Sequence, residues 1–167
     1  GHSSSIVKKD LQKISETARQ LVDSMSDIVW VVNPQRDSLH DLIVKLKDSY
    51  NEFFSSIGIS FQVNNVEKSD DIKLPMDYKQ NLLLMFKEAI NNAIKHSGCK
   101  KLILEASYKN DIIEIVLKDD GTGFEINKVK FGNGIKNMEN RANKIKGKLS
   151  YKSEVGGGTI VSFSGKL

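Results

Sequence analysis

The chain has 167 residues and a formal net charge of +4, a length that suits one compact domain with an appendage. Its 39% apolar residues can fill a core, yet no apolar run approaches the roughly 18 residues of a membrane span. The lysines are scattered and accompany no groove-reading motif, so we expect no nucleic-acid partner. The single cysteine, Cys99, excludes an internal disulfide and is typical of a reducing compartment. We expect a cytoplasmic domain, compatible with a full-length protein anchored in the inner membrane.

The first part of the chain is predicted to be one long helix. Residues 1–5 resemble the remnant of an affinity tag and are left out of the fold prediction. Over residues 6–32, apolar residues recur at alternating steps of three and four, namely Leu11, Ile14, Ala18, Leu21, Met25 and Ile28. This heptad pattern fits either a helix paired with a second helix or an amphipathic helix packed on its own domain. Pro34 then ends the helix.

The rest of the chain alternates helices with short strands. We predict helices over residues 37–56, 76–97 and 134–147, and strands near residues 59–63, 102–106, 113–117, 148–154 and 158–165. Lys109-Asn110-Asp111 is predicted to be a hairpin turn, and residues 120–133 an irregular glycine-containing segment. The pattern predicts an α/β (α+β) two-layer sandwich: a mixed, mostly antiparallel sheet with helices on one face, preceded by one long stem helix.

The helix at 76–97 carries a polar strip. Glu88, Asn92 and Lys95 are spaced i, i+4 and i+7, so they lie on one side, opposite the apolar residues. Asn91 and Asn92 are poor helix formers in mid-helix, where a surface would favour lysine, glutamate or alanine. A carboxylate and an amide one turn apart offer oxygens that suit Mg²⁺, and Lys95 can meet phosphate oxygens. The alternative is an ordinary solvated polar face.

Two glycine-containing segments follow. Asp119 ends a predicted strand, and a carboxylate there can accept a hydrogen bond from the exocyclic amine of adenine, while Gly121 and Gly123 let the backbone approach a base. The alternative is an acidic tight turn. Gly132-Asn133-Gly134 precedes a helix, whose free N–H groups attract phosphate. The alternative there is a simple loop-to-helix junction. Neither a P-loop nor a Rossmann fingerprint fits these glycines.

Together, these motifs resemble the catalytic and ATP-binding domain of sensor histidine kinases, the Bergerat-type (GHKL) ATPase fold. The resemblance covers residues 37–167. The segment KEAINNAIKH looks like the N-box, DDGTGF like the first glycine box, and GNGIKNMENR like the second, followed by KGKL and GGGTIVSF. The form is similar to the subfamily that partners LuxR-type response regulators, although Asn140 stands where an acid is usual.

The resemblance implies a role for each site residue. Asn92 corresponds to the Mg²⁺ ligand, and Glu88 to the acid on the same helix face, which we assign as catalytic and as a second Mg²⁺ ligand through water. Lys95 and His96 match positions near the phosphates, and Asp119 matches the acid that reads adenine. The remaining nucleotide-binding positions are the glycines beside that acid, the lid hinge and a hydroxyl near adenine: Gly121, Gly123, Gly132, Gly134 and Thr159.

The resemblance also implies ATP and Mg²⁺ as cofactors, and as partners a LuxR-type response regulator and a phosphoacceptor stem. Residues 6–33 look like a remnant of that dimerisation and phosphotransfer stem, so homodimerisation through helix 6–32 is expected. This helix carries no histidine, and His40-Asp41 follows the break at Pro34. We therefore expect the fragment to lack its acceptor and to be unable to autophosphorylate.

Two other functions fit the same residues. One is a nucleotide-sensing interaction module that binds ATP without phosphotransfer and docks a partner through the heptad helix. The other is an anti-sigma-factor type of kinase that transfers to serine. The N-terminal helix argues against the latter, since those proteins are normally the bare domain.

Overall fold

The computed structural model describes residues 2–64, 71–126 and 132–167. The chain divides into two compact units, Gly1–Arg36 and Asp37–Leu167. Part of the irregular segment predicted at 120–133, residues 127–131, lies outside the described residues. Across the described ranges, no helix combines the length and apolarity needed to cross a bilayer.

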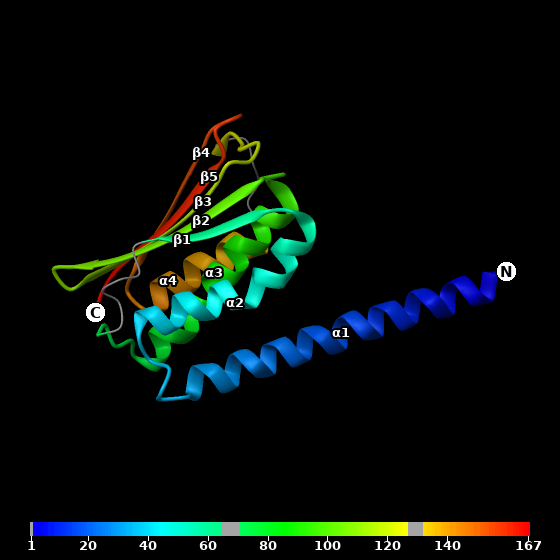
Figure 1. Cartoon of the computed structure of the whole chain (residues 1–167), viewed down its shortest axis with the longest axis horizontal. Coiled ribbons are helices and arrows are strands. Elements are labelled where there is room, and N and C mark those ends of the chain that lie inside the picture. The colour runs from blue at the N-terminus through cyan, green and yellow to red at the C-terminus, as the bar shows by residue number, and fades with distance from the viewer. Residues whose placement is uncertain (1, 65–70, 127–131) are drawn as a thin grey trace. The chain divides into compact units, whose positions relative to one another are not determined.

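The first unit is the predicted helix. α1 spans His2–Val32 (Figure 1), so it begins earlier than the heptad pattern alone indicates. Its seam residues remain in solvent: Leu11, Ile14, Leu21 and Met25 are 60–65% exposed. A row of large apolar side chains in water is thermodynamically unfavourable, because burial of each would contribute about 1.5–3 kcal/mol.

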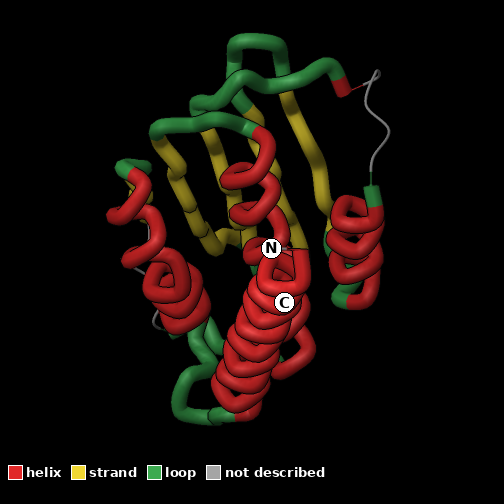
Figure 2. Tube along the Cα trace, turned by 90° about the vertical axis from the view of Figure 1, so that its right-hand side faces the viewer, coloured by secondary structure: helices red, strands yellow, loops and turns green. Residues whose placement is uncertain are grey.

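The second unit is an α/β two-layer sandwich, as predicted. Its elements are α2 (Leu39–Ile57), β1 (Ser60–Asn64), α3 (Met76–His96), β2 (Lys101–Lys109), β3 (Ile112–Asp119), α4 (Asn133–Lys144), β4 (Lys148–Ser153) and β5 (Thr159–Lys166). The strands form one sheet in the order β1-β2-β3-β5-β4, with β1 and β2 parallel and the other pairs antiparallel. Figures 1 and 2 show α2, α3 and α4 on the same face of this sheet.

Local chemistry explains why α2 starts and stops where it does. Ser38 accepts a hydrogen bond from the backbone N–H of Asp41, and the Asp41 carboxylate accepts one from the Ser38 N–H, which is a complete capping box. At the other end Gly58 adopts a left-handed φ of 71°, which glycine tolerates without a Cβ clash. Both ends lie within two residues of the predicted boundaries, 37 and 56.

The core lies between the helices and the sheet. α3 is its central helix and buries Leu82, Leu83, Met85, Phe86 and Ile90 completely. On the sheet side, alternate residues are buried from Leu102 to Ala106 in β2 and from Ile113 to Leu117 in β3, which is the pattern of a strand with one covered face. This alternation determines which strand residues face the helices. It therefore also determines which polar side chains of the strands lie on the helix side of the sheet.

Two turns refine the prediction. Asn110 and Asp111 both have positive φ, 52° and 62°, which is the twist that a two-residue hairpin needs. α4 ends at Lys144 and not at residue 147 as predicted. Lys146 enters the left-handed region at φ 53°, and the N–H of Gly147 turns back to the carbonyl of Ala142. The apolar periodicity runs past this stop because Ile145 is still buried.

Candidate nucleotide-binding site

Asp119 is the last residue of β3 and shares a face with its buried residues. Side chains alternate along a strand, so Asp119 lies on the same side as Ile115 and Leu117, toward the helices. Its cross-strand partner is Thr159 at the start of β5. A half-buried carboxylate at the end of a central strand is therefore presented to the space between helices and sheet.

The surroundings of Asp119 keep it available as an acceptor. Burial raises the pKa of its carboxyl group, while N–H groups of Gly121 and Thr159 partly offset this by donating hydrogen bonds to it. The Gly121 N–H lies 2.9 Å from Oδ1. Because both partners are N–H donors, they favour the ionised carboxylate, which accepts from a ligand amine and cannot donate.

The neighbouring Asp120 has a different role. Its Oδ1 accepts the backbone N–H groups of Lys100 and Lys101 at 2.8 and 2.9 Å. The Lys101 N–H leads the causes that lower the pKa of the Asp120 carboxyl, and desolvation opposes them. This exposed residue is therefore a structural clamp at the start of β2, and only the first acid of the Asp-Asp pair is free to meet a ligand.

The glycines after Asp119 allow close backbone approach. A Cβ on Gly121 would overlap the carbonyl oxygen of Ser97, just after α3, and the Thr122 N–H donates to that same oxygen at 2.8 Å. Gly123 has φ 61° and lies against the backbone of Glu154. The glycine-containing segment after Asp119 therefore packs against the carboxyl end of α3.

The polar strip of α3 is only partly solvated. Glu88 and Asn92 are half-buried, whereas Lys95 and His96 are exposed. Asn91, the other unusual helix residue, accepts a hydrogen bond from the buried Tyr50 hydroxyl at 3.1 Å. Asn91 thus has a structural explanation in the packing of α2 against α3, whereas this packing does not account for Asn92.

Glu88 meets the start of α4. A Cβ on Gly134 would overlap Oε1 of Glu88, so the carboxylate lies directly against this glycine. Gly132 is the N-cap residue of α4 and has no side chain to satisfy the first-turn N–H groups. Glu88 therefore lies against Gly134 in the middle of α3. Asp119 lies with Gly121 and Thr159 near the carboxyl end of the same helix. Asn92 and Lys95 lie on α3 between these two points.

The described residues offer few ligands for the expected Mg²⁺ ion. Among the ranges that the structure describes, no group of three or more His, Cys, Asp or Glu is arranged to hold a metal. Mg²⁺ bound with a nucleotide needs only one or two protein oxygens, since phosphates and waters complete its shell. Glu88 and Asn92, one helical turn apart, satisfy that smaller requirement.

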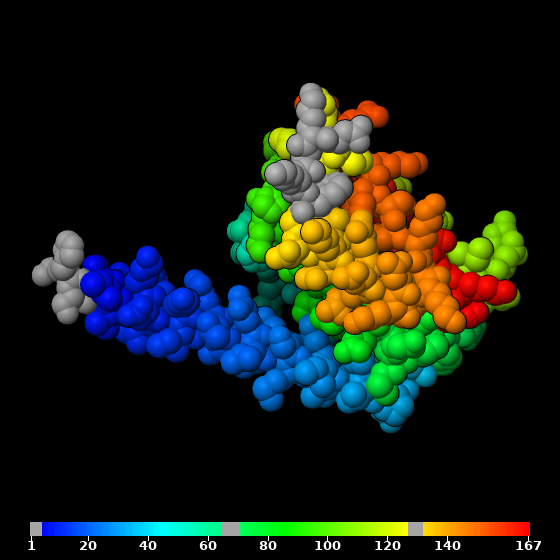
Figure 3. Space-filling view, turned by 180° about the vertical axis from the view of Figure 1, so that it is seen from behind, coloured from blue at the N-terminus to red at the C-terminus, as the bar shows by residue number. Residues whose placement is uncertain are grey.

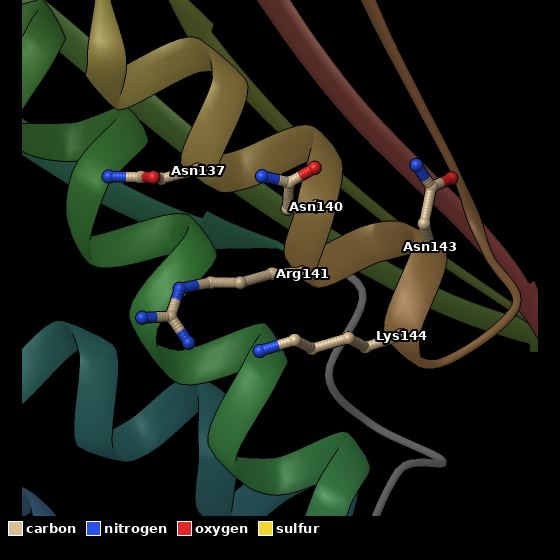
Figure 4. Close-up of a pocket in the computed structure, with 5 residues that line it drawn as sticks. All are labelled: Asn137, Asn140, Arg141, Asn143 and Lys144. Carbon is tan, nitrogen blue, oxygen red and sulfur yellow. The ribbon is translucent and has the colours of Figure 1, made fainter.

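A separate hollow lies along α4, away from these residues. It is lined by Asn137, Asn140, Arg141, Asn143 and Lys144, whose side chains Figure 4 draws in full. All five belong to one helix, which forms part of the molecular surface in Figure 3. Asp119, Gly121, Glu88 and Asn92 do not line it, so we do not place the nucleotide there.

One further polar residue at the site was not predicted from sequence. Ser153, at the end of β4, contacts both the segment after Asp119 and the start of β5. Its partners are 5 to 29 residues away, and a lone serine at a strand end carries no signal of such contacts. Its position before the three glycines at 156–158 is the one hint that the sequence offers.

Comparison with known families identifies the class of the domain. Residues 78–167 match the family of histidine kinase-, DNA gyrase B-, and HSP90-like ATPases. This match covers more than half of the chain, and the chain belongs to that family. Within it, the domain is an ATP-binding catalytic domain homologous to those of sensor histidine kinases.

Curated relatives include proteins named as a sensor histidine kinase and as a sensor protein. The chain is 28% identical over 154 residues to the sensor histidine kinase LnrJ of Bacillus subtilis, covering 88% of this chain and 37% of the relative. It is 32% identical over 113 residues to the sensor protein VraS of Staphylococcus aureus, covering 64% of this chain and 33% of the relative. The chain thus spans only about a third of the length of these relatives.

Solved structures agree on the fold. The histidine kinase AdeS of Acinetobacter baumannii has a TM-score of 0.67 at 16% identity, covering 96% of this chain and 84% of that one. The histidine kinase domain of the blue-light activated kinase of Erythrobacter litoralis has a TM-score of 0.64 at 18% identity, covering 75% and 61%. The predicted sandwich preceded by a long helix is therefore confirmed.

Proposed function

We propose that this chain is the ATP-binding and catalytic part of a two-component sensor kinase that transfers the γ-phosphoryl group of ATP to a histidine. The observation that carries the proposal is the half-buried Asp119 carboxylate on the helix side of the sheet, which accepts hydrogen bonds from the backbone of Gly121 and Thr159. A carboxylate oxygen at this position is suited to accept a hydrogen bond from the amino group of adenine.

The same geometry suggests how the nucleotide lies. With the base at Asp119, the phosphates would extend along α3 toward Asn92 and Glu88, with Lys95 and His96 nearby. Ser97 lies nine positions after Glu88, which corresponds to about 14 Å along the helix at about 1.5 Å per residue. The free N–H groups at the start of α4, after Gly132, would face the phosphate end. Gly123 would lie beside the base, next to Asp119.

The proposed reaction is a displacement at phosphorus. An imidazole nitrogen attacks the γ-phosphorus, the bond to the bridging oxygen breaks, and ADP leaves with that electron pair. The other ring nitrogen then releases its proton to solvent, which leaves a neutral phosphorylated imidazole. Bound Mg²⁺ would screen the negative charge of the phosphates. Asn92 would contribute an amide oxygen to the metal, and Glu88 would hold a metal-bound water, so the protein positions the reactants rather than forming a covalent intermediate.

The partners follow from the family and from α1. We propose that residues 37–167 form the catalytic domain and residues 6–33 the end of a dimerisation stem, with residues 1–5 left from a tag. Two copies would pair through the exposed seam of helix 6–32. The acceptor histidine would lie on stem sequence beyond this chain. A LuxR-type response regulator would receive the phosphoryl group, and the domain would work in the cytoplasm, below an inner-membrane anchor.

A transfer assay tests this proposal. The chain is incubated with labelled ATP and a separately made stem that carries the acceptor histidine. We expect acid-labile phosphate on the stem, lost with Asn92→Ala and retained with Asp120→Asn, since Asp120 only clamps β2. Stem that remains unlabelled by a folded, ATP-binding chain would contradict the kinase proposal.

A second candidate is a nucleotide-sensing module that docks a partner through α1 without phosphotransfer. The exposed apolar seam of that helix favours it as much as it favours a dimeric stem. ATP-dependent association in the absence of any labelled histidine would support this candidate. A labelled serine in a partner protein would instead support the anti-sigma-factor type of kinase.

A further inference from the structure

Ser153 forms three hydrogen bonds at the end of β4. Its hydroxyl donates to the carbonyl of Gly158 at 3.0 Å and accepts the backbone N–H of Phe124 at 2.9 Å. Its Oγ also lies 3.0 Å from Oγ1 of Thr159. The side chain shares its face of the sheet with Thr159 and Asp119, because Ser153 pairs with Thr159 and Thr159 with Asp119.

The number of protons fixes the direction of the serine–threonine hydrogen bond. A hydroxyl has one proton to donate and two lone pairs to accept with. Since the proton of Ser153 points to the Gly158 carbonyl, the proton between the two hydroxyls must come from Thr159. Thr159 therefore donates its only hydroxyl proton to Ser153, and towards a ligand it can act only as an acceptor.

We propose that Ser153 is the positioning residue that makes Thr159 an obligate acceptor and ties the segment after Asp119 to the β4–β5 hairpin. This inference rests on the proposed function, which places adenine at Asp119. With Asp119 ionised and Thr159 oriented by Ser153, this corner presents acceptors to the base. A 6-aminopurine offers N–H donors to them, whereas a 6-oxopurine places an oxygen acceptor at the same position.

Removing the Ser153 hydroxyl should release Thr159. In Ser153→Ala the threonine hydroxyl could rotate and donate, so a 6-oxopurine would no longer meet only acceptors. We expect the preference for ATP over ITP to fall about 5- to 10-fold, the range that one hydrogen bond of about 1 kcal/mol allows. Ser153→Thr keeps a hydroxyl on the same Cβ and should restore most of the preference.

The chain offers a matched control on the same strand. Ser150 and Ser162 form a cross-strand hydroxyl hydrogen bond at 2.7 Å. Ser150 is an odd number of residues from Ser153, so it lies on the opposite face of β4, away from the helices. Ser150→Ala removes an equivalent bond from the same sheet and should leave the preference for ATP unchanged.

The experiment measures the dissociation constants of ATP and ITP for the parent chain, Ser153→Ala, Ser153→Thr, Ser150→Ala, Thr159→Val and the double variant Ser153→Ala/Thr159→Val, with circular dichroism to check folding. If Ser153 acts through Thr159, its substitution has little further effect on the ATP/ITP ratio in the Thr159→Val background. An unchanged ratio in folded Ser153→Ala, or fully additive effects in the double variant, would overturn the inference while leaving the proposed function intact. A folded parent chain that binds no ATP would overturn both.

Discussion

Asp119 and Asp120 are adjacent acids whose pKa values shift in opposite directions. Burial raises that of Asp119, and hydrogen bonds from the backbone of Lys101 and Lys100 lower that of Asp120. Two carboxylates next to one another in sequence are thus separated by the alternation of side chains at a strand end. The Asp119 carboxylate lowers the stability of the fold, whereas the Asp120 carboxylate raises it.

Asp119→Asn is expected to abolish adenine selectivity and leave the chain at least as stable. The raised pKa means that ionised Asp119 destabilises the folded state above that pKa, and this penalty disappears below its unfolded value near 3.8. An amide of the same shape relieves the penalty at pH 7. Thermal denaturation and ATP titration of the same sample measure both effects. A lower melting temperature with unchanged ATP binding would contradict the assignment.

Asp120→Ala should show the reverse pattern. It leaves two backbone N–H groups without their carboxylate acceptor, so we expect a loss of about 1 kcal/mol in unfolding free energy. ATP affinity should change little. Because the pKa of Asp120 is lowered, its contribution to stability is present above the unfolded pKa and is lost as the pH falls through the lower folded value. Urea denaturation at pH 7 and at pH 3 tests this directly.

At the scale of elements, Gly134 and Gly121 have different neighbours, so substitution of the first should affect function and substitution of the second should affect folding. A methyl group at Gly134 would meet the end of the Glu88 side chain, which can move, whereas one at Gly121 would meet the Ser97 backbone, which cannot. Gly134→Ala should therefore fold and displace Glu88, lowering the rate of phosphotransfer. Gly121→Ala should lose about 1–3 kcal/mol of stability, because the added methyl group overpacks against backbone. Equal melting temperatures for the two variants would contradict this.

Packing between α2 and α3 explains why Asn91, but not Asn92, stands in the middle of α3. Tyr50→Phe removes the hydroxyl that donates toward Asn91 and toward the Lys87 carbonyl, at 3.1 and 3.2 Å. We expect it to lower the unfolding free energy by about 1 kcal/mol without altering Mg-dependent ATP affinity. Asn92→Ala should weaken Mg-dependent ATP affinity and leave the unfolding free energy nearly unchanged. Calorimetric titration with and without Mg²⁺, next to a denaturation curve, distinguishes them.

Much of the fold and part of the site follow from local patterns. The capping box of Ser38 and the hairpin turn at Asn110 are short-range, so the sequence specifies them almost completely. The link from Asn91 to Tyr50 spans 41 residues, and that from Ser153 to Phe124 spans 29, so neither leaves a periodic signal. The split roles of Asp119 and Asp120 likewise needed the strand register.

At the scale of the whole molecule, the exposed seam of α1 predicts self-association. Replacing Leu21 and Met25, which are 61% and 65% exposed, with lysine should leave the catalytic unit folded and shift any dimer to monomer. Two charges at a and d positions oppose helix pairing. Sedimentation equilibrium at several concentrations measures the change. A parent chain that stays monomeric at all of them would contradict dimerisation through α1.

The central claim is that Asp119, Asn92 and the glycine turns form one Mg-ATP pocket, and a calorimetric titration tests it most directly. ATP is titrated with and without Mg²⁺, with GTP as the control. We expect saturable, adenine-selective binding that tightens with Mg²⁺ and is lost in Asp119→Asn. Equal affinity for ATP and GTP, or no binding by the folded chain, would contradict the assignment of this pocket.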